Sequence, residues 1–235
     1  MSKSALITGA SRGIGFETAK KLLAEKNNYS CIVLTARESN DFEQAIDKLN
    51  KLNQYDKKII YRYVDIGNHA QLKKSIQSIY KEVGNIHLLV NNAGYTNPVP
   101  LQLVKFDDFE KTMAVNLYAP FILVQDLLHL GNKFEVIVNI ASTAGINGRS
   151  GWLTYSASKA ALINMSSVMR EELSIHGTRV VCISPGRTAT SLRKVLAPNE
   201  DPTTIMQPEH VAKVIEMLIS PTGQFIDSEN LVVRL

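Results

Sequence analysis

Short apolar runs and longer amphipathic segments alternate along this 235-residue chain. Strands are expected at Ala5–Thr8, Cys31–Thr35, Ile59–Val64, Ile86–Val90, Glu135–Ile140, Val180–Ser184 and Leu231–Val233. Helical periodicity is expected near residues 13–27, 40–54, 69–83, 106–131, 155–175 and 208–219. Several runs are apolar throughout, as in strands that helices cover on both faces. The alternation predicts an α/β fold with a doubly wound, parallel, seven-stranded sheet between helices.

The chain is expected to form one domain over residues 1–235. Its length is ordinary for a single α/β domain, and no internal repeat, low-complexity tract or Ser/Gly linker divides it. The irregular stretch is 187–207, which contains Pro198 and Pro202. We expect this segment to be a substrate loop that lies over a site.

The composition argues against several classes of protein. Hydrophobic residues make up 45% of the chain and no run approaches the roughly 18 apolar residues of a membrane span, so no membrane partner and a cytoplasmic location are expected. The net charge is +4, but basic and acidic residues are interleaved, so no nucleic-acid partner is expected. Cys31 and Cys182 lie in strand-like runs and the histidines are scattered, which predicts no metal site and no disulfide.

A glycine-rich turn follows the first strand-like run. It reads Thr8-Gly-Ala-Ser-Arg-Gly-Ile-Gly15, and a helical segment follows it. The spacing is not the usual G-x-G-x-x-G, yet glycines here let the backbone approach a ligand closely. Amides at a helix start and the helix dipole favour a phosphate. The position at the first strand-to-helix junction predicts a site for the pyrophosphate of a dinucleotide, the alternative being an ordinary turn.

Tyr155 and Lys159 are four residues apart in a helical segment, so they lie on one face. An ammonium beside a phenol lowers the phenol's pKa from about 10, which suits acid–base chemistry. Alone, such a pair is usually an ordinary surface contact. Ser142 follows the fifth strand-like run, where open sheets bind ligands, although a helix cap or turn role is equally open.

Taken together, these motifs resemble the short-chain dehydrogenase/reductase family. The matching motifs occur in the family's order: Thr8-Gly-x-x-x-Gly-x-Gly15, Asn91-Asn-Ala-Gly94, Asn116, Ser142, Tyr155-x-x-x-Lys159 and Pro185-Gly186. The resemblance runs from Ala5 to Gly186, is loose beyond, and points to NADP(H)-preferring enzymes such as 3-oxoacyl-carrier-protein reductases and related carbonyl reductases. It implies a Rossmann fold and reduction of a ketone or aldehyde, or the reverse oxidation of an alcohol.

The resemblance also implies four catalytic residues. Ser142 would hold the substrate carbonyl oxygen, Tyr155 would transfer its proton as general acid or base, and Lys159 would also bond the nicotinamide ribose. Asn116 would support a proton-relay water, its alternative being a helix-interior asparagine bonded to backbone. A noncatalytic NADP-binding regulator on the same fold is the competing function.

Cofactor recognition follows from the same resemblance. Ala36 stands in the place of the family's ribose-binding acid, and Arg37 with Arg12 would clamp the 2′-phosphate of NADP(H) unless Arg37 pairs with Glu38. Asp65 would bond the adenine amino group, its alternative being a helix N-cap. The implied set is Gly9, Ser11, Arg12, Gly13, Ile14, Gly15, Arg37, Asp65, Ile66, Asn92, Ala93, Gly94, Tyr155, Lys159, Pro185 and Gly186, with Thr188 and Thr190 near the nicotinamide carboxamide.

Two further expectations concern partners. Arg149, Arg187, Arg193 and Lys194 flank the site, which predicts a small-molecule substrate with an anionic group unless these cations form a solvated rim that residues 199–201 partly neutralise. The long helical segments carry apolar residues on more than one face, which predicts a homodimer or homotetramer. The candidate contact residues are Phe121, Leu127, Leu128, Val168 and Met169.

Overall fold

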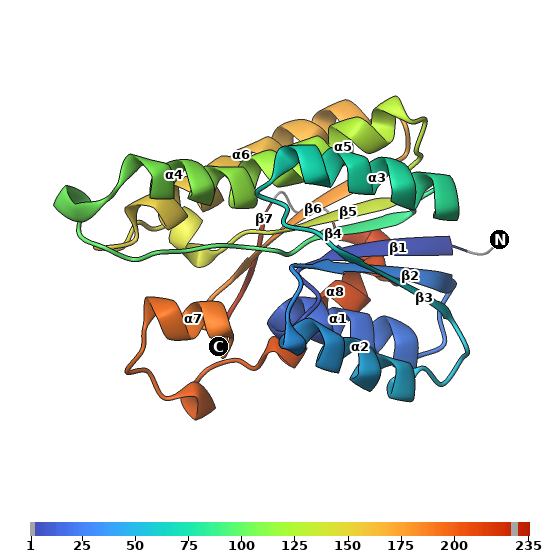
Figure 1. The fold of residues 1–235 in the computed structure, drawn as a ribbon, viewed down its shortest axis with the longest axis horizontal. Coiled ribbons are helices and arrows are strands. Elements are labelled where there is room, and N and C mark those ends of the chain that lie inside the picture. Colours follow the sequence, from blue (N-terminus) through green and yellow to red (C-terminus); the bar gives the residue numbers. More distant parts are fainter. Residues whose placement is uncertain (1–2, 227–229) are drawn as a thin grey trace.

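A seven-stranded, all-parallel sheet forms the centre of the computed structural model, which describes residues 3–226 and 230–235 (Figure 1). The strand order is β3-β2-β1-β4-β5-β6-β7, and it reverses direction between β1 and β4. The strands are β1 (Lys3–Thr8), β2 (Tyr29–Ala36), β3 (Lys58–Tyr63), β4 (Leu88–Asn91), β5 (Val136–Ile140), β6 (Arg179–Pro185) and β7 (Asn230–Val233). The predicted doubly wound Rossmann sheet is confirmed.

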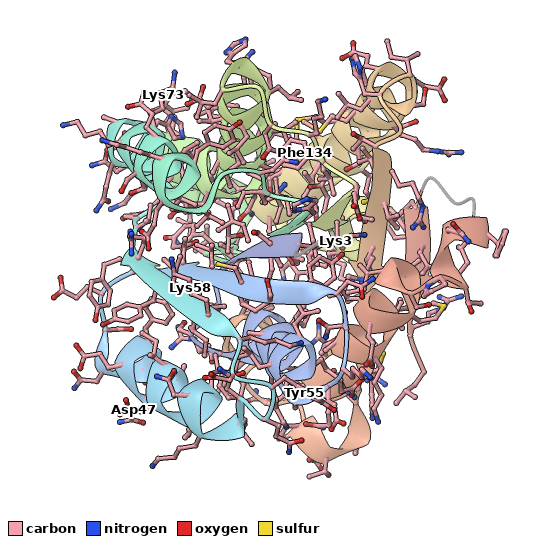
Figure 2. The ribbon with its side chains drawn as sticks, turned by 90° about the vertical axis from the view of Figure 1, so that its right-hand side faces the viewer. Lys3, Asp47, Tyr55, Lys58, Lys73 and Phe134 are labelled. Carbon is pink, nitrogen blue, oxygen red and sulfur yellow. The ribbon has the colours of Figure 1, made fainter. Side chains whose placement is uncertain are left out.

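Helices cover both faces of the sheet. One layer holds α1 (Gly13–Ala24), α2 (Asn40–Leu52) and α8 (Pro208–Ile219), and the other holds α3 (His69–Val83), α4 (Phe106–Met113), α5 (Ala119–His129) and α6 (Leu153–Ser174). Figure 2 shows the same layers from the side on which β1 begins at Lys3, with Lys73 in the upper layer and Asp47 in the lower.

The burial of β1 side chains explains why its central residues, Ala5 to Ile7, are all apolar. Ala5 and Ile7 lie in the apolar cluster that α1, α2 and α8 form with the sheet, whereas Leu6 lies in the cluster on the opposite face. All three are at most 1% exposed. Because neither face of the strand meets water, both the odd and the even positions are apolar.

The segment predicted as one helix over 106–131 is continuous but not uniform. Between α4 and α5, residues Ala114–Tyr118 form a π-helical turn, and Asn116 within it is fully buried. Turns of this kind are rare and often occur at functional sites, because they turn one side chain out of the regular helical register.

The segment 187–207 is more ordered than its sequence suggests. It contains α7 (Ser191–Leu196) and a single 3-10 turn at Pro202–Thr204. Its two ends pair, since the Ala189 amide donates to the Met206 carbonyl (2.7 Å) and the Met206 amide donates to the Arg187 carbonyl (3.1 Å). The segment is therefore a closed loop beside the carboxyl ends of the strands (Figure 1).

The five apolar residues predicted to form a subunit contact differ in how exposed their side chains are. Leu127 and Met169 are wrong candidates because the chain buries them in its own core, to 0% and 9% exposure. Leu128 is partly buried against the same core. Phe121 and Val168 are 43% and 48% exposed, so these two remain available on α5 and α6.

Within residues 3–226 and 230–235, no helix combines the length and apolar character that crossing a bilayer requires. In the same part of the chain, no three His, Cys, Asp or Glu side chains are gathered to hold a metal ion. Cys31 on β2 and Cys182 on β6 are both free thiols.

Candidate active site

A pocket of about 450 Å³ lies at the carboxyl ends of the strands. The segments that follow β1, β2, β3, β4, β5 and β6 all contribute to its wall, which spans the point where the strand order reverses. Open α/β sheets bind their ligands there. The expected cofactor residues that line it are Gly9, Ser11, Arg12, Gly13, Ile14, Arg37, Asp65, Ile66, Asn92, Ala93, Gly94, Tyr155, Lys159, Pro185, Gly186, Thr188 and Thr190.

The start of α1 differs from the starts of its neighbours. At α2 and α3, the side chains of Ser39 and Asn68 cap the helix by accepting hydrogen bonds from backbone amides. At α1, the cap residue Arg12 makes no side-chain cap, and the first turn has no acidic residue. The amides at Gly13 and Ile14 therefore keep their partial positive charge on the pocket wall, which suits a phosphate group.

Gly15 is the one expected cofactor residue that does not line the pocket, and its role is packing. A Cβ at Gly15 would come within 2.5 Å of both Asn92 Nδ2 and the Gly9 carbonyl oxygen. Asn92 Nδ2 donates to the carbonyls of Thr8 (2.8 Å) and Gly9 (3.1 Å), and the Thr8 hydroxyl accepts from the Asn92 and Ala93 amides (3.0 Å each). These bonds fix the turn after β1 to the turn after β4.

The two arginines expected to clamp a 2′-phosphate differ in their surroundings. Arg37 is exposed on the pocket wall beside Ala36, and no ion pair with Glu38 is present among the described residues. Arg12 is also on the wall, but its Nη1 donates to Asp41 Oδ2 at 2.5 Å. A phosphate that binds here would have to compete with Asp41 for Arg12, whereas it would meet no such competitor at Arg37 in the part of the chain that the structure describes.

Asp65 lines the pocket at the end of β3, and the alternative that it caps a helix is wrong. Asn68 caps α3 by accepting from the Gln71 amide at 3.1 Å. Asp65 Oδ1 instead accepts from the Gly67 amide at 3.0 Å, which holds the carboxylate in the turn.

Ser142, Tyr155 and Lys159 come together in the pocket, as the sequence predicted. Ser142 follows β5, and its side chain forms a hydrogen bond with that of Tyr155 while also accepting from the Ala144 amide at 3.1 Å. The cap considered for Ser142 is therefore present, in a residue that also lines the pocket. Lys159 Nζ donates to the Ile140 carbonyl at 2.7 Å and lies 5.9 Å from the centre of the Tyr155 ring.

Burial is the largest influence on the pKa values of both Tyr155 and Lys159. Burial raises the pKa of Tyr155, against the opposing effects of the Ser142 hydrogen bond and the charge of Arg193. Burial also lowers the pKa of Lys159, to about 8. The expected net lowering of the Tyr155 pKa is wrong for this structure, because desolvation of the phenol outweighs the interactions that favour its phenolate.

Asn116 does not line the pocket. Its Oδ1 accepts from the Tyr95 amide (2.8 Å), and its Nδ2 donates to the Tyr95 carbonyl and to Ser158 Oγ (2.9 Å each). The Ser158 hydroxyl in turn donates to the Tyr155 carbonyl at 2.8 Å. The side chain of Asn116 thus joins the pocket wall at Tyr95 to the first turn of α6.

Several residues that line the pocket were not singled out by the sequence analysis. Tyr95, Thr96, Lys111 and Leu192 line it, and so does Trp152, the single tryptophan. The guanidinium carbons of Arg149 and Arg193 lie 5.6 and 5.5 Å from a ring centre of Trp152. The signal for Trp152 was its position three residues before Tyr155, nearly one helical turn away.

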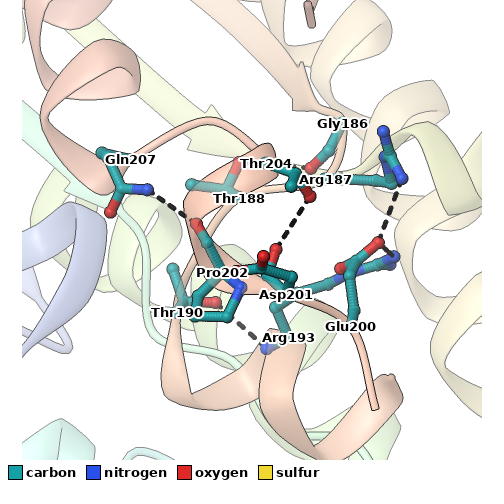
Figure 3. A network of polar contacts seen from close by, with 10 residues as sticks. All are labelled: Gly186, Arg187, Thr188, Thr190, Arg193, Glu200, Asp201, Pro202, Thr204 and Gln207. Carbon is teal, nitrogen blue, oxygen red and sulfur yellow. Dashed lines mark hydrogen bonds and ion pairs between the residues drawn. The ribbon is translucent and has the colours of Figure 1, made fainter. Parts of the chain in front are cut away.

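Of the four basic residues predicted at the mouth, Arg149, Arg187 and Arg193 line the pocket and Lys194 does not. Figure 3 shows how Glu200 holds two of them. Glu200 accepts from Arg193 Nε (2.5 Å) and Nη2 (2.7 Å) and from Arg187 Nη1 (3.3 Å). The expected partial neutralisation therefore comes from Glu200.

Hydrogen bonds distinguish the two threonines after β6 (Figure 3). The Thr190 hydroxyl caps α7 by accepting from the Arg193 amide at 3.1 Å. The Thr188 hydroxyl donates to the Gly186 carbonyl at 3.2 Å, and Thr188 is buried. Asp201 is also engaged locally, since it accepts from the amide and hydroxyl of Thr203 at 2.8 Å.

Comparison with known proteins agrees with this geometry. The family model described as short chain dehydrogenase matches residues 3–201. The 3-oxoacyl-[acyl-carrier-protein] reductase of Vibrio cholerae is 30% identical over 242 residues, covering 99% of this chain and 96% of that protein. A blue fluorescent protein from a metagenomic library, solved with NADPH, is 26% identical with a TM-score of 0.85, covering 98% of this chain and 96% of that one. A 4-hydroxyisoleucine dehydrogenase solved with NADH is 28% identical with a TM-score of 0.84, covering 99% and 97%. The chain belongs to the short-chain dehydrogenase family of oxidoreductases.

Proposed function

We propose that this protein is an NADP(H)-dependent carbonyl reductase, which reduces a ketone or aldehyde to an alcohol or runs the reverse oxidation. The observation that supports it best is the meeting of Ser142, Tyr155 and buried Lys159 on one wall of the pocket that the glycine turn borders. A noncatalytic regulator gives no reason to bring a serine, a tyrosine and a lysine together at the nicotinamide end of the pocket.

The wall of the pocket fits a dinucleotide from end to end. The uncapped amides at the start of α1 suit the pyrophosphate, and Asp65, Ile66 and Asn92–Gly94 border the adenosine position. Arg37 supports the choice of NADP(H), because a guanidinium binds a phosphate with charge-assisted hydrogen bonds. One relative of known structure was solved with NADPH and another with NADH. Family membership therefore does not decide the cofactor, and the proposed preference for NADP(H) rests on Arg37.

The far end of the pocket suits the nicotinamide, which when bound supplies the hydride. Pro185 at the end of β6 and the following Gly186 are on the pocket wall, and Lys159, which lines the same pocket, would bond the adjoining ribose. Thr188 and Thr190 are both candidates for the carboxamide contact, since the hydroxyl of Thr188 bonds the Gly186 carbonyl and that of Thr190 caps α7.

In reduction, Ser142 orients the carbonyl oxygen and Tyr155 gives it the proton from its hydroxyl, leaving a phenolate. The Ser142 hydrogen bond and the charge of Arg193 favour that phenolate, and the Lys159 ammonium, 5.9 Å from the ring centre, would add a further stabilising charge. Oxidation reverses these steps, with Tyr155 as the base. Asn116 acts as a positioning residue through Ser158 and Tyr95.

We also propose a homodimer or homotetramer. Its support is the exposure of Phe121 on α5 and Val168 on α6, two apolar side chains that a monomer leaves in water. Light scattering at micromolar protein concentration tests this, and a purely monomeric protein would contradict it.

A carbonyl panel tests the proposed function. Purified protein is mixed with NADPH, or with NADH, and a set of ketones and aldehydes, and the loss of reduced cofactor is followed by absorbance. We expect turnover of at least one carbonyl, faster with NADPH, and a loss of about 100-fold or more in Tyr155→Phe. Binding of NADPH, seen by fluorescence, with no carbonyl consumed would favour the regulator instead.

A further inference from the structure

Cations line the substrate end of the pocket. Arg149, Arg187 and Arg193 are on this wall with Tyr155, and among the described lining residues the one carboxylate is Asp65, which lies at the adenosine end. Glu200 binds two of the arginines but is not part of the wall. A substrate entering here therefore meets an excess of positive charge.

Arg193 is held in one place rather than free in solvent. Its guanidinium donates twice to Glu200, and the two side chains are only 17% and 15% exposed. It also lies 5.5 Å from the Trp152 ring centre, within the range of a cation–π contact. A fixed guanidinium loses less conformational entropy when it binds a ligand.

The held guanidinium lies near the reacting end of the pocket. Trp152 immediately precedes the first turn of α6, which carries Tyr155. Arg193 is close enough to Tyr155 for its charge to oppose the rise in the pKa of the phenol. Arg149 contacts the same indole from the loop that follows Ser142, with its guanidinium carbon at 5.6 Å. Two guanidiniums thus converge on one aromatic ring about a helical turn from Tyr155.

We propose that Arg193 and Arg149 bind an anionic group of the carbonyl substrate, and that Arg193 determines specificity for an oxo acid. This inference rests on the proposed reductase function. Because Nε and Nη2 of Arg193 donate to Glu200, the groups that would bind a carboxylate or a phosphate are Nη1 of Arg193 and the guanidinium of Arg149, with the Trp152 ring between them as an apolar wall. The substrate class is a ketone or aldehyde that carries a carboxylate or phosphate a few bonds from its carbonyl.

Matched pairs of ketones test the proposal. Acetoacetate and ethyl acetoacetate differ by one carboxylate charge, and dihydroxyacetone phosphate and dihydroxyacetone differ by a phosphate. For each protein, the readout is the ratio of kcat/KM for the charged ketone to kcat/KM for the neutral one, which cancels any effect on Tyr155. The variants are Arg193→Met, Arg193→Lys and Arg149→Met, and the control is Lys194→Met, on the same helix but off the wall.

We expect the wild-type ratio to favour the charged member of one pair, which identifies carboxylate or phosphate. Arg193→Met should lower that ratio about tenfold or more, chiefly through KM, as expected for loss of a hydrogen bond between charged groups. Arg149→Met should lower it too, and Arg193→Lys should restore part of it. Lys194→Met should leave it unchanged. A ratio that is the same in wild type and Arg193→Met, or a wild type that favours the neutral ketone in both pairs, overturns the proposal.

The same design separates this inference from the proposed function. Reduction of neutral ketones with an unchanged ratio overturns the anion site and leaves the reductase intact. If no carbonyl is consumed, calorimetry of acetoacetate and of dihydroxyacetone phosphate with the NADPH-loaded protein decides instead. A Kd that weakens about tenfold or more in Arg193→Met supports the anion site without catalysis. Equal binding, or no binding to the wild type, overturns it.

Discussion

The backbone of Gly145 lies against that of Lys159, so closely that a Cβ on Gly145 would come within 2.6 Å of the Lys159 carbonyl carbon. Gly145 ends the 3-10 turn that Ser142 caps. This contact therefore sets the distance between the segment that carries Ser142 and the helix that carries Tyr155 and Lys159.

We expect Gly145→Ala to separate these two segments, because the clash is with backbone that cannot rotate away. Activity with NADPH should fall about 100-fold or more, as for loss of the general acid, and the Tm should drop. Gly148→Ala is the matched control, since a Cβ there meets nothing within 4 Å. Steady-state kinetics and thermal melts of both variants make the comparison, and equal activity in the two would contradict the packing argument.

The rate of carbonyl reduction should depend on the charge of Lys159. Burial lowers its pKa to about 8, and burial raises that of Tyr155, so at neutral pH both groups carry the proton that reduction needs. As the pH rises through about 8, the ammonium is lost and the phenolate product of proton transfer loses a stabilising charge. We predict that kcat/KM for reduction declines above about pH 8. A profile that stays level to about pH 10, near the ordinary pKa of tyrosine, would exclude Lys159 from this role.

Arg37 should set the choice between NADPH and NADH. Arg37→Asp removes the cation beside the ribose position and adds a carboxylate, so we expect kcat/KM with NADPH to fall about tenfold or more while NADH is favoured. Lys48→Asp makes the same charge change at an exposed position of α2 that does not line the pocket. Equal use of the two cofactors by the wild type would count against Arg37 as the selecting residue.

Glu200 should hold the loop 187–207 closed. Hydrogen bonds from Arg193 keep the pKa of Glu200 below its usual range, so its ion pairs are present at neutral pH and are lost only as the pH falls through that lowered value. We predict that Glu200→Gln speeds trypsin cleavage after Arg187, Arg193 and Lys194 severalfold, with little change in Tm, because the opening is local. Glu209→Gln, which removes an exposed pair on α8, is the control. Equal cleavage of the two variants would argue against the proposal that the ion pairs of Glu200 hold the loop closed.

Much of the fold was predictable because its signals are local. The apolar run of β1 and the turn from Gly9 to Gly15 depend on burial and backbone geometry that neighbouring residues determine. The π-helical turn at Asn116 was not predictable. It depends on the approach of Tyr95 and Ser158, which are 21 and 42 residues away in the sequence.

For the candidate site too, the sequence predicted some features and could not predict others. The sequence placed Ser142, Tyr155 and Lys159 together, but it could not show that Ser142 acts as a cap and bonds Tyr155 at once. It placed Arg193 near the site without its partner Glu200, because that pairing depends on how the loop closes. It also misjudged Leu127 and Met169, since an apolar residue on a long helix faces either the core or a subunit partner.

Transfer of deuterium from the cofactor tests the central claim most directly. NADPH that carries deuterium at the transferred position is incubated with the protein and a carbonyl compound from the panel, and the product is examined by mass spectrometry and NMR. We predict one deuterium on the carbinol carbon of the product with the wild type, and about 100-fold less labelled product in the same time with Tyr155→Phe. An unlabelled alcohol, no alcohol with any carbonyl, or equal labelling by Tyr155→Phe would contradict carbonyl reduction with Tyr155 as the proton donor.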